Sequence, residues 1–402
     1  MTATSIELWG PFLVAMAVSA VVTPAAIWAA PKIGAMDIPK DERRIHNKPM
    51  PRFGGIAIYA GITVALAVFA WNAPGVRSAV VGCSMIYVLG LIDDLKNLRH
   101  IVKFAGQLVC AAVTYALGLR IQFITNYFGE GNMIFGDAAC FLITVLWLVS
   151  ITNAVNLVDG LDGLAAGISA ISALCIGYVA YIHGQYVPTM AMMIIAGAAL
   201  GFLPYNFHPA KIFMGDSGSE LLGFAIAAFS ILGTVKSSTI IVVVIPALVL
   251  GLPIFDTIFA IVRRVLRRQP IGRGDKEHLH HRIMKAGFGQ RRAVMLMYCI
   301  SGIMGIVAVL YSRDYVVEYL GLLAVAAMLI YVLLSDTGNR NISLKAKKIS
   351  REKDLDDRGQ ERSDKQTKEN EQAEGDGETK ENERTETSRQ VEKEQHDNSQ
   401  AV

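Results

Sequence analysis

The stretch NAVNLVDGLDGLAAGISAISALCIGYVAYI, residues 153–182, joins a polar, glycine-rich segment to an apolar run long enough to cross a bilayer. A second apolar run, residues 136–153, comes directly before it. Charge at membrane depth is costly, so Asp159 and Asp162 are functional candidates by default. The stretch predicts a helical membrane fold that carries acidic groups at the ends of its helices.

Apolar windows of this length recur along the chain as far as Leu334, and 52% of the 402 residues are hydrophobic. A bilayer core about 30 Å thick needs roughly 20 apolar residues per helix, which gives about eleven spans. The predicted spans are residues 6–30, 54–72, 77–93, 101–119, 136–153, 164–183, 187–204, 217–235, 239–262, 294–312 and 316–334. The predicted fold class is all-α, a polytopic integral membrane protein whose membrane domain covers residues 1–335.

The composition changes abruptly after Ser335. Residues 336–402 mix both charge signs and contain few apolar side chains. Such a segment cannot bury enough surface to fold, so it is predicted to be a disordered tail. The net charge of the whole chain is only +3, which gives no support to a nucleic-acid partner.

The basic residues separate the predicted loops into two groups. Counted with the basic residues at the span edges, Lys103 and Arg77, the loops after the odd-numbered spans contain 20 Lys and Arg residues, and those after the even-numbered spans contain 4. By the positive-inside rule the first group is cytoplasmic, which places the N-terminus outside and the tail inside. The unusual polar clusters fall in the same group, at residues 46–55, 93–100, 153–163, 206–219 and 272–283. The chemistry is therefore expected at helix ends on the cytoplasmic face of the membrane.

Two pairs of carboxylates stand out among these clusters. Asp93 and Asp94 end the third predicted span, where they could bind Mg²⁺, raise one another's pKa or act as a base. A charge pair that simply reaches water is the alternative. Asp159 and Asp162 are three residues apart and would share one face of a helix, with Asn156 adding an amide. A capped helix start is the alternative for this second pair.

The sequence FMGDSGSE, residues 213–220, places Asp216 between glycines at the start of the eighth predicted span. A helix N-terminus with free N–H groups favours phosphate, and a carboxylate there can hold a divalent cation that bridges phosphate oxygens. Asp216 acting as an N-cap is compatible with that role. Phe213 could stack on a nucleobase or belong to the core.

Two further clusters supply cations. The imidazoles in HLHHR, residues 278–282, suit an anion clamp better than a zinc site, and a solvated basic loop is the alternative. Lys48 and Arg52 flank prolines, and Gly54 and Gly55 would let the second span begin close to a neighbouring helix. Carboxylates for Mg²⁺, cations for phosphate and glycines for close approach together indicate phosphoryl transfer, in which positioning and charge neutralisation do most of the work.

The motifs NAVNLVDGLDGLAAG, KIFMGDSGS, PRFGG and HLHH, with the DD pair, resemble those of the polyprenyl-phosphate N-acetylhexosamine-1-phosphate transferases over residues 46–285. The resemblance implies transfer of a phospho-sugar from a UDP-amino sugar to undecaprenyl phosphate, with release of UMP. It also implies dependence on Mg²⁺, with Mn²⁺ as a substitute, and a place in the bacterial plasma membrane. The partners expected are undecaprenyl phosphate, UDP-N-acetylglucosamine, membrane lipid and a second copy of the chain in a homodimer.

The histidine motif bears on the branch of the family. Leu279 interrupts the run and Arg282 follows it, which is similar to the branch that uses UDP-N-acetylglucosamine and starts teichoic acid linkage units and related envelope glycans. The branch that uses UDP-N-acetylmuramoyl-pentapeptide, with three consecutive histidines, is the first alternative. A secondary transporter is the second, although polar groups at helix ends favour the enzyme. A phospholipid-forming alcohol phosphotransferase would need Ala-Arg after its DG pair, and DGLDGLAAG lacks it.

The resemblance also implies roles for individual residues. The implied catalytic residues are Asp93, Asp94, Lys48, Lys103, Asp159, Asp162, His278, His280 and His281. The implied substrate contacts are Asn156, Asn206, Phe213, Arg52 and Arg282. The implied metal ligands are Asp216 and Asp94.

Overall fold

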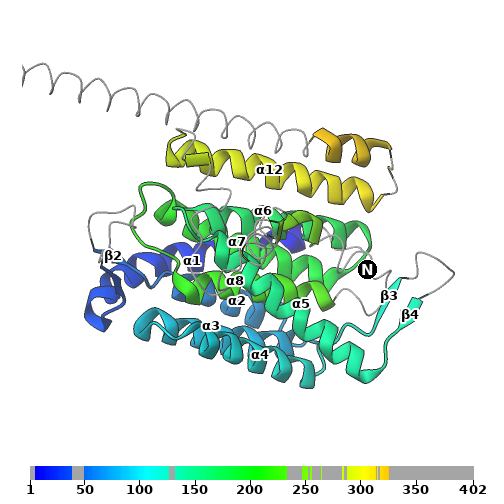
Figure 1. Cartoon of the computed structure of the whole chain (residues 1–402), viewed down its shortest axis with the longest axis horizontal. Coiled ribbons are helices and arrows are strands. Elements are labelled where there is room, and N and C mark those ends of the chain that lie inside the picture. Colours follow the sequence, from blue (N-terminus) through cyan, green and yellow to red (C-terminus); the bar gives the residue numbers. More distant parts are fainter. Residues whose placement is uncertain are drawn as a thin grey trace, which may run out of the picture. The chain divides into compact units, whose positions relative to one another are not determined.

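Helices form most of the regular structure in the computed structural model of the chain (Figure 1). The structure describes residues 5–38, 49–125, 132–232, 247–251, 254–255, 264, 283–284, 288–313, 315 and 317–325. All of these residues belong to one unit, Met1–Thr337.

The helices and strands follow one another along the chain in a simple order. The helices are α1 (Ser5–Ile33), α2 (Gly55–Phe69), α3 (Val76–Lys96), α4 (His100–Ala116), α5 (Asp137–Val158), α6 (Leu164–Ile182), α7 (Tyr186–Asn206), α8 (Gly215–Ile231) and α12 (Gln290–Tyr311). Two antiparallel strand pairs lie between helices: β1 (Met36–Asp37) with β2 (Met50–Pro51), and β3 (Phe123–Thr125) with β4 (Asn132–Ile134).

The predicted spans coincide with these helices, whose ends differ from the predicted ones by a few residues. The spans predicted at 239–262 and 316–334 lie largely outside the described residues, although residues 317–325 are helical. Within the described ranges, six helices are long and apolar enough to cross a membrane, namely α1, α3, α5, α6, α7 and α12. Helices α2 and α4 are shorter and also apolar. The prediction of a polytopic helical membrane protein is confirmed.

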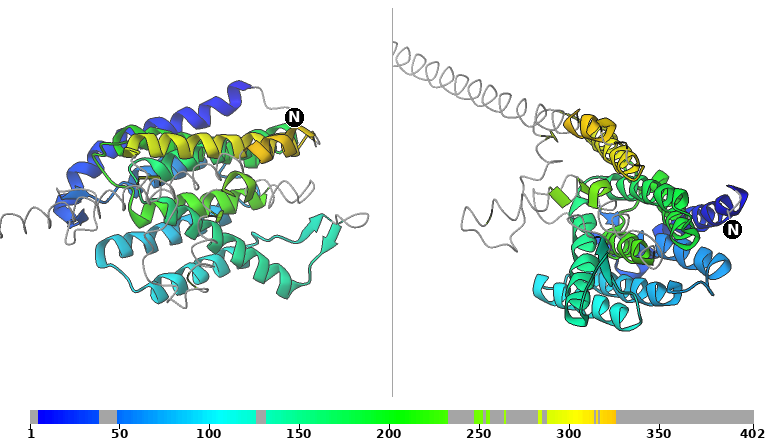
Figure 2. Two further views of the ribbon diagram at one scale, coloured as in Figure 1. Left: turned by 45° about the horizontal axis from the view of Figure 1, so that its top comes forward. Right: turned by 90° about the vertical axis from the view of Figure 1, so that its right-hand side faces the viewer.

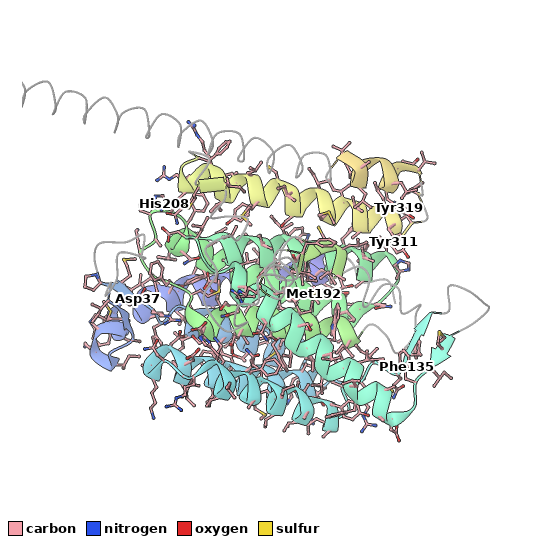
Figure 3. All side chains as sticks on the ribbon, viewed as in Figure 1. Asp37, Phe135, Met192, His208, Tyr311 and Tyr319 are labelled. Carbon is pink, nitrogen blue, oxygen red and sulfur yellow. The ribbon has the colours of Figure 1, made fainter. Side chains whose placement is uncertain are left out.

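Different loops lie at the two ends of the helix bundle (Figure 3). Asp37, which follows α1, and His208, which follows α7, lie at one end. Phe135, which precedes α5, and Tyr311, at the end of α12, lie at the other. This distribution agrees with the separation of the loops into odd-numbered and even-numbered groups.

Small residues let the helices approach closely, as is common between membrane helices. A Cβ atom added to Gly197 of α7 would lie 2.3 Å from the Phe12 carbonyl oxygen of α1, and one on Gly201 would lie 2.2 Å from that of Met16. Helix α8 lies among α2, α3 and α5 (Figure 2), and every residue from Ser217 to Ile231 is buried. The polar start of α8 is therefore held by helices on several sides.

Candidate active site

Charged side chains from four separate segments meet at one end of the bundle, and we call this group the ion cluster. Asp93 and Asp94 lie in the last turn of α3, and Lys103 lies in the first turn of α4. Asp216 lies in the first turn of α8, and Arg52 directly follows β2. The sequence predicted functional roles for all five, and the structure brings them together.

Asp216 lies at the centre of the ion cluster. One of its oxygens contacts the Arg52 guanidinium. The other accepts hydrogen bonds from Lys103 Nζ at 3.0 Å and from Asn156 Nδ2 at 2.7 Å. Asn156, near the end of α5, also donates to Ser219 Oγ at 2.9 Å. Both carboxylate oxygens thus face donors, and two of the three donors are cationic.

Lys103 links several acidic groups through one ammonium group. Its Nζ atom lies 2.9 Å from Asp93 Oδ2, 3.0 Å from Asp216 Oδ1 and 2.9 Å from Glu220 Oε1. An ammonium group has three N–H donors, so these three carboxylates can use all of them. Glu220 was not predicted as a site residue, although a charge inside an otherwise apolar span was a signal that could have found it.

Asp94 has a different environment from its neighbour Asp93, because its side chain is fully buried. Its Oδ1 accepts from the Asp216 backbone N–H at 2.7 Å and lies 3.0 Å from Arg52 Nε. Its Oδ2 accepts from the Ser217 backbone N–H at 3.0 Å and from Ser217 Oγ at 2.6 Å. Asp94 therefore caps α8 from another helix.

This cap corrects the prediction that the N-terminus of α8 keeps its N–H groups free for phosphate. The first N–H groups of a helix have no partner inside the helix, and the helix dipole favours an anion beside them. The N–H groups of Asp216 and Ser217 are enclosed by neighbouring helices. They donate to the carboxylate of Asp94, which is the anion at this helix N-terminus. Metal binding by Asp94 stays a prediction, since each of its oxygens already has two donors.

Glycines bring α2 and α3 against the start of α8. A Cβ atom on Gly55 would lie 2.4 Å from Ser217 Oγ, and one on Gly90 would lie 2.6 Å from Ser217 Cα. A Cβ atom on Gly54 would lie 2.7 Å from the Phe213 carbonyl oxygen. The close approach predicted from Gly54 and Gly55 is confirmed, and it places Arg52 beside the carboxylates of α3 and α8.

Asp159 and Asp162 lie in the turn between α5 and α6, because α5 ends at Val158 and α6 begins at Leu164. The prediction that they share a face of a helix is therefore wrong. Gly163, with a φ of 80°, adopts the left-handed conformation that glycine permits, and the helix cannot continue through it. Burial, helped by the negative charge of Asp216, raises the pKa of Asp159 to about 7. Asp159 is thus an electrostatic neighbour of the ion cluster.

Asp162 contacts the segment between α7 and α8. Its Oδ2 lies 2.8 Å from His208 Nδ1 and accepts the Ala210 backbone N–H at 3.2 Å. Asn206, which is buried, accepts the Gly163 N–H at 3.1 Å and donates to the Ile212 carbonyl at 2.9 Å. These bonds fix the turn against the segment that leads into α8. The catalytic role of Asp162 and the substrate contact of Asn206 stay predictions.

Helix α12 completes this second group, which we call the turn anchor: Asp162, Gly163, Asn206, His208 and Tyr298. The Tyr298 hydroxyl donates to the Gly163 carbonyl at 2.6 Å. Arg291 Nε donates to the His208 carbonyl at 3.0 Å. The sequence analysis did not single out His208, although it lies in the polar cluster at residues 206–219, and it missed Tyr298, whose partner Gly163 lies far away along the chain.

The remaining predicted site residues differ in what the structure describes. Phe213 is half-buried, and its backbone N–H donates to the Pro51 carbonyl at 2.8 Å. Its stacking role stays a prediction. The other predicted residues lie outside the described residues: Lys48, His278, His280, His281 and Arg282.

The donor chemistry of the ion cluster suits a hard divalent cation. Among the described residues, no three His, Cys, Asp or Glu side chains are already arranged as a metal site. Within the part of the chain that the structure describes, four carboxylates contact the cations Arg52 and Lys103, namely Asp93, Asp94, Asp216 and Glu220, and Asp159 interacts with Arg52 electrostatically. Excess negative charge on carboxylate oxygens is what Mg²⁺ binds in proteins. The residues therefore fit the ion that the sequence predicted.

Comparison with known proteins gives a consistent result. The family described as glycosyl transferase family 4 matches residues 76–234. A probable undecaprenyl-phosphate N-acetylglucosaminyl 1-phosphate transferase of Bacillus subtilis is 41% identical over 335 residues, which cover 83% of this chain and 93% of that protein. A decaprenyl-phosphate N-acetylglucosaminephosphotransferase of Mycolicibacterium smegmatis is 35% identical, with coverage of 68% and 74%.

A more distant relative shows the same relationship. The undecaprenyl-phosphate alpha-N-acetylglucosaminyl 1-phosphate transferase of Escherichia coli K12 is 28% identical over 294 residues, with coverage of 72% of this chain and 79% of that protein. The membrane fold, the ion cluster and these matches define a membrane-embedded sugar-phosphate transferase. The chain belongs to glycosyl transferase family 4, in the branch of the polyprenyl-phosphate N-acetylglucosamine-1-phosphate transferases.

Proposed function

We propose that the protein transfers N-acetylglucosamine 1-phosphate from UDP-N-acetylglucosamine to undecaprenyl phosphate. UMP is released, and undecaprenyl-diphospho-N-acetylglucosamine is formed as the first lipid-linked intermediate of a cell-envelope glycan. The observation that carries the proposal is the convergence of Asp93, Lys103 and Asp216 with Arg52 at one end of the bundle. The activity named for the relative that is 41% identical supports the choice of sugar and lipid.

The ion cluster is the proposed site of Mg²⁺. Asp216 and Asp93, with Asp159 nearby, would hold the ion with carboxylate oxygens. When bound, the ion supplies positive charge that neutralises the diphosphate of the UDP-sugar. Asp94 has the separate task of holding the start of α8, and with it Asp216, in place.

The cations of the cluster are the proposed phosphate contacts. Arg52 and Lys103 pair with carboxylates in this structure, and both can offer the same N–H groups to phosphate oxygens. Arg52 presents a planar fork, which suits two oxygens of one phosphate group. Exchange of carboxylate oxygens for phosphate oxygens would bring the substrate beside Asp216.

The proposed chemistry is a direct displacement. An oxygen of the lipid phosphate attacks the β-phosphorus of the UDP-sugar, and the bond from that phosphorus to the oxygen of UMP breaks. A phosphate monoester has a second pKa of about 6, so the nucleophile is mostly ionised near pH 7. Asp93 is then needed to orient the nucleophile rather than to remove a proton. Trapping a phospho-sugar on an aspartate would establish a two-step route instead.

The arrangement in the membrane is part of the proposal. About eleven spans, an external N-terminus and a disordered cytoplasmic tail from residue 336 follow from apolar length and the positive-inside rule. The ion cluster then faces the cytoplasm. The proposed assembly is a homodimer in the plasma membrane of a bacterium.

The test uses membranes that contain the full chain, undecaprenyl phosphate, Mg²⁺ and UDP-N-acetylglucosamine labelled in the sugar. We expect lipid-linked label and one UMP per label, loss of both with EDTA, and recovery when Mg²⁺ is restored. A parallel arm supplies UDP-N-acetylmuramoyl-pentapeptide, and product from that sugar alone would establish the pentapeptide branch. Uptake of sugar into proteoliposomes without UMP release would establish a transporter.

A further inference from the structure

A buried polar chain lies beneath Lys103, on the side of the ion cluster away from water. Glu220 of α8 is fully buried, and its Oε1 accepts from Lys103 Nζ at 2.9 Å and from Gln107 Nε2 at 2.8 Å. The Oε1 of Gln107, which is also buried, accepts from Asn153 Nδ2 at 2.7 Å. Asn153 in turn donates to the Val149 carbonyl at 2.8 Å. The chain runs from α5 through α4 to α8 and ends on Lys103.

The position of Glu220 on its helix explains this geometry. Glu220 follows Asp216 by four residues on α8, so the two side chains lie on one face, one turn apart. Asp216 is partly exposed, whereas Glu220 is fully buried. Lys103 bridges the two carboxylates through its one ammonium group, with the partly exposed Asp216 on the outer side and the buried Glu220 on the inner side.

Burial of this polar chain costs solvation free energy, and the packing of the helices alone does not explain why polar groups lie there. A carboxylate removed from water loses favourable solvation, and replacement of buried ionic groups by apolar ones is often neutral or stabilising. The Oε2 of Glu220 has no hydrogen-bond partner among the described residues, so the carboxylate is only partly compensated. Buried polar groups of this kind in a membrane protein indicate function.

We propose that Glu220, held by Gln107 and Asn153, is a positioning residue that fixes the Lys103 ammonium between Asp93 and Asp216. A lysine side chain has four rotatable bonds and loses conformational entropy when it is held. The inner contact to Glu220 Oε1 provides the third point that defines where Nζ lies. This inference rests on the proposed function, because the position of Lys103 matters through the phosphate groups that it would contact.

The test is a double-mutant cycle on transfer of labelled N-acetylglucosamine phosphate, with Lys103→Met and Glu220→Leu alone and combined. We expect Glu220→Leu to lower kcat by about 10²-fold, the scale at which small misplacement acts. We expect it to cause no further loss when added to Lys103→Met, because Glu220 acts through that ammonium. Multiplied losses in the double variant, or normal kcat in Lys103→Met, would overturn the inference.

Two further variants separate positioning from folding. Glu220→Gln keeps an acceptor oxygen for Lys103 and Gln107, so we expect it to restore most of the kcat lost in Glu220→Leu. A loss as large as that of Glu220→Leu would count against the proposal. Ser230→Ala removes a buried hydroxyl on the same helix that bonds only locally, to Ala227, and should leave kcat unchanged. The thermal midpoint in detergent is measured for every variant.

The wild-type measurement in the same assay separates failure of the proposed function from failure of the role inferred for Glu220. If the wild-type protein makes no lipid-linked product, the proposed function fails. If it makes product and the losses in the cycle multiply, only the role of Glu220 fails.

Discussion

The ion cluster and the turn anchor are both built from aspartates beside glycines, yet their partners differ. In the ion cluster the oxygens of Asp93 and Asp216 face Lys103, and Asp216 also faces Arg52. In the turn anchor, Asp162 contacts the His208 ring and a backbone N–H. Contacts to the side-chain cations Arg52 and Lys103 can be exchanged for those of a phosphorylated substrate, whereas contacts to backbone groups fix the fold. The comparison teaches that the partners of an aspartate, rather than the residues beside it in sequence, indicate its task.

The largest effect is expected at the centre of the ion cluster. Asp216→Asn removes the charge that faces Arg52 and Lys103, and we expect transfer to fall by at least about 10³-fold. The thermal midpoint should change little, because Arg52 keeps its contact to Asp94 and Lys103 keeps its contacts to Asp93 and Glu220. Both quantities are measured on purified protein, by labelled-lipid formation and by thermal unfolding in detergent.

Asp137→Asn is the matched control for this variant. It makes the same change in the first turn of α5, where the side chain is exposed at the opposite end of the bundle. It should transfer at the wild-type rate. Comparable turnover in the two variants would show that the ion cluster is not the centre of the chemistry.

A smaller effect is expected when the charge of the ion cluster is kept and its geometry is changed. Arg52 contacts Asp94 through Nε and Asp216 through Nη2, and a lysine cannot reproduce both contacts. We expect Arg52→Lys to lower kcat/KM by the order of 10²-fold, the scale of a small misplacement. Steady-state kinetics over UDP-N-acetylglucosamine concentration measure it, and kcat/KM within twofold of wild type would refute a role for the fork.

In the turn anchor a substitution should lower stability more than activity, the opposite of what is expected in the ion cluster. Asp162→Asn weakens the contacts to His208 and to the Ala210 N–H, and we expect a loss of about 1–3 kcal/mol in unfolding free energy. Transfer below the unfolding temperature should fall by less than about tenfold, because no cation or phosphate contact is removed. A loss of transfer as large as that of Asp216→Asn, with unchanged stability, would show that Asp162 acts in the reaction together with the ion cluster.

The smallest effect is expected at the contact between α12 and the turn. Tyr298→Phe removes one hydroxyl, which donates to the Gly163 carbonyl at 2.6 Å. A typical hydrogen bond contributes about 0.5–1.5 kcal/mol, so the thermal midpoint should fall slightly while kcat stays the same. A marked drop in kcat at constant midpoint would mean that α12 acts on the chemistry and not only on the fold.

The helices were predictable because apolar length is a local property of the chain. Each helix from α1 to α8 coincides with a window that was visible in the sequence, and only the ends shifted. The gathering of Asp93, Lys103 and Asp216 was also predictable, since all three lie at helix ends that the positive-inside rule places on one side.

What the sequence could not show were contacts between distant segments. The bond between Asp94 and the Asp216 N–H spans 122 residues, and it decides that Asp94 caps a helix. The turn after α5 depends on the positive φ of Gly163, which spacing alone did not distinguish from a helical face. Glu220 and Gln107 meet across 113 residues inside the bundle, where the packing of α4 and α8 against α3 and α5 decides which polar groups are neighbours.

The glycine contacts of α8 have a consequence for how this enzyme can change over generations. Because Gly55 and Gly90 leave no room for even one methyl group beside Ser217, a single substitution at either position would push the backbone of α8 away from its cap. A substitution at Gly55 or Gly90 that conferred drug resistance would therefore also impair the enzyme. A compound that presses on the start of α8 should meet escape variants elsewhere, and seldom at these two positions.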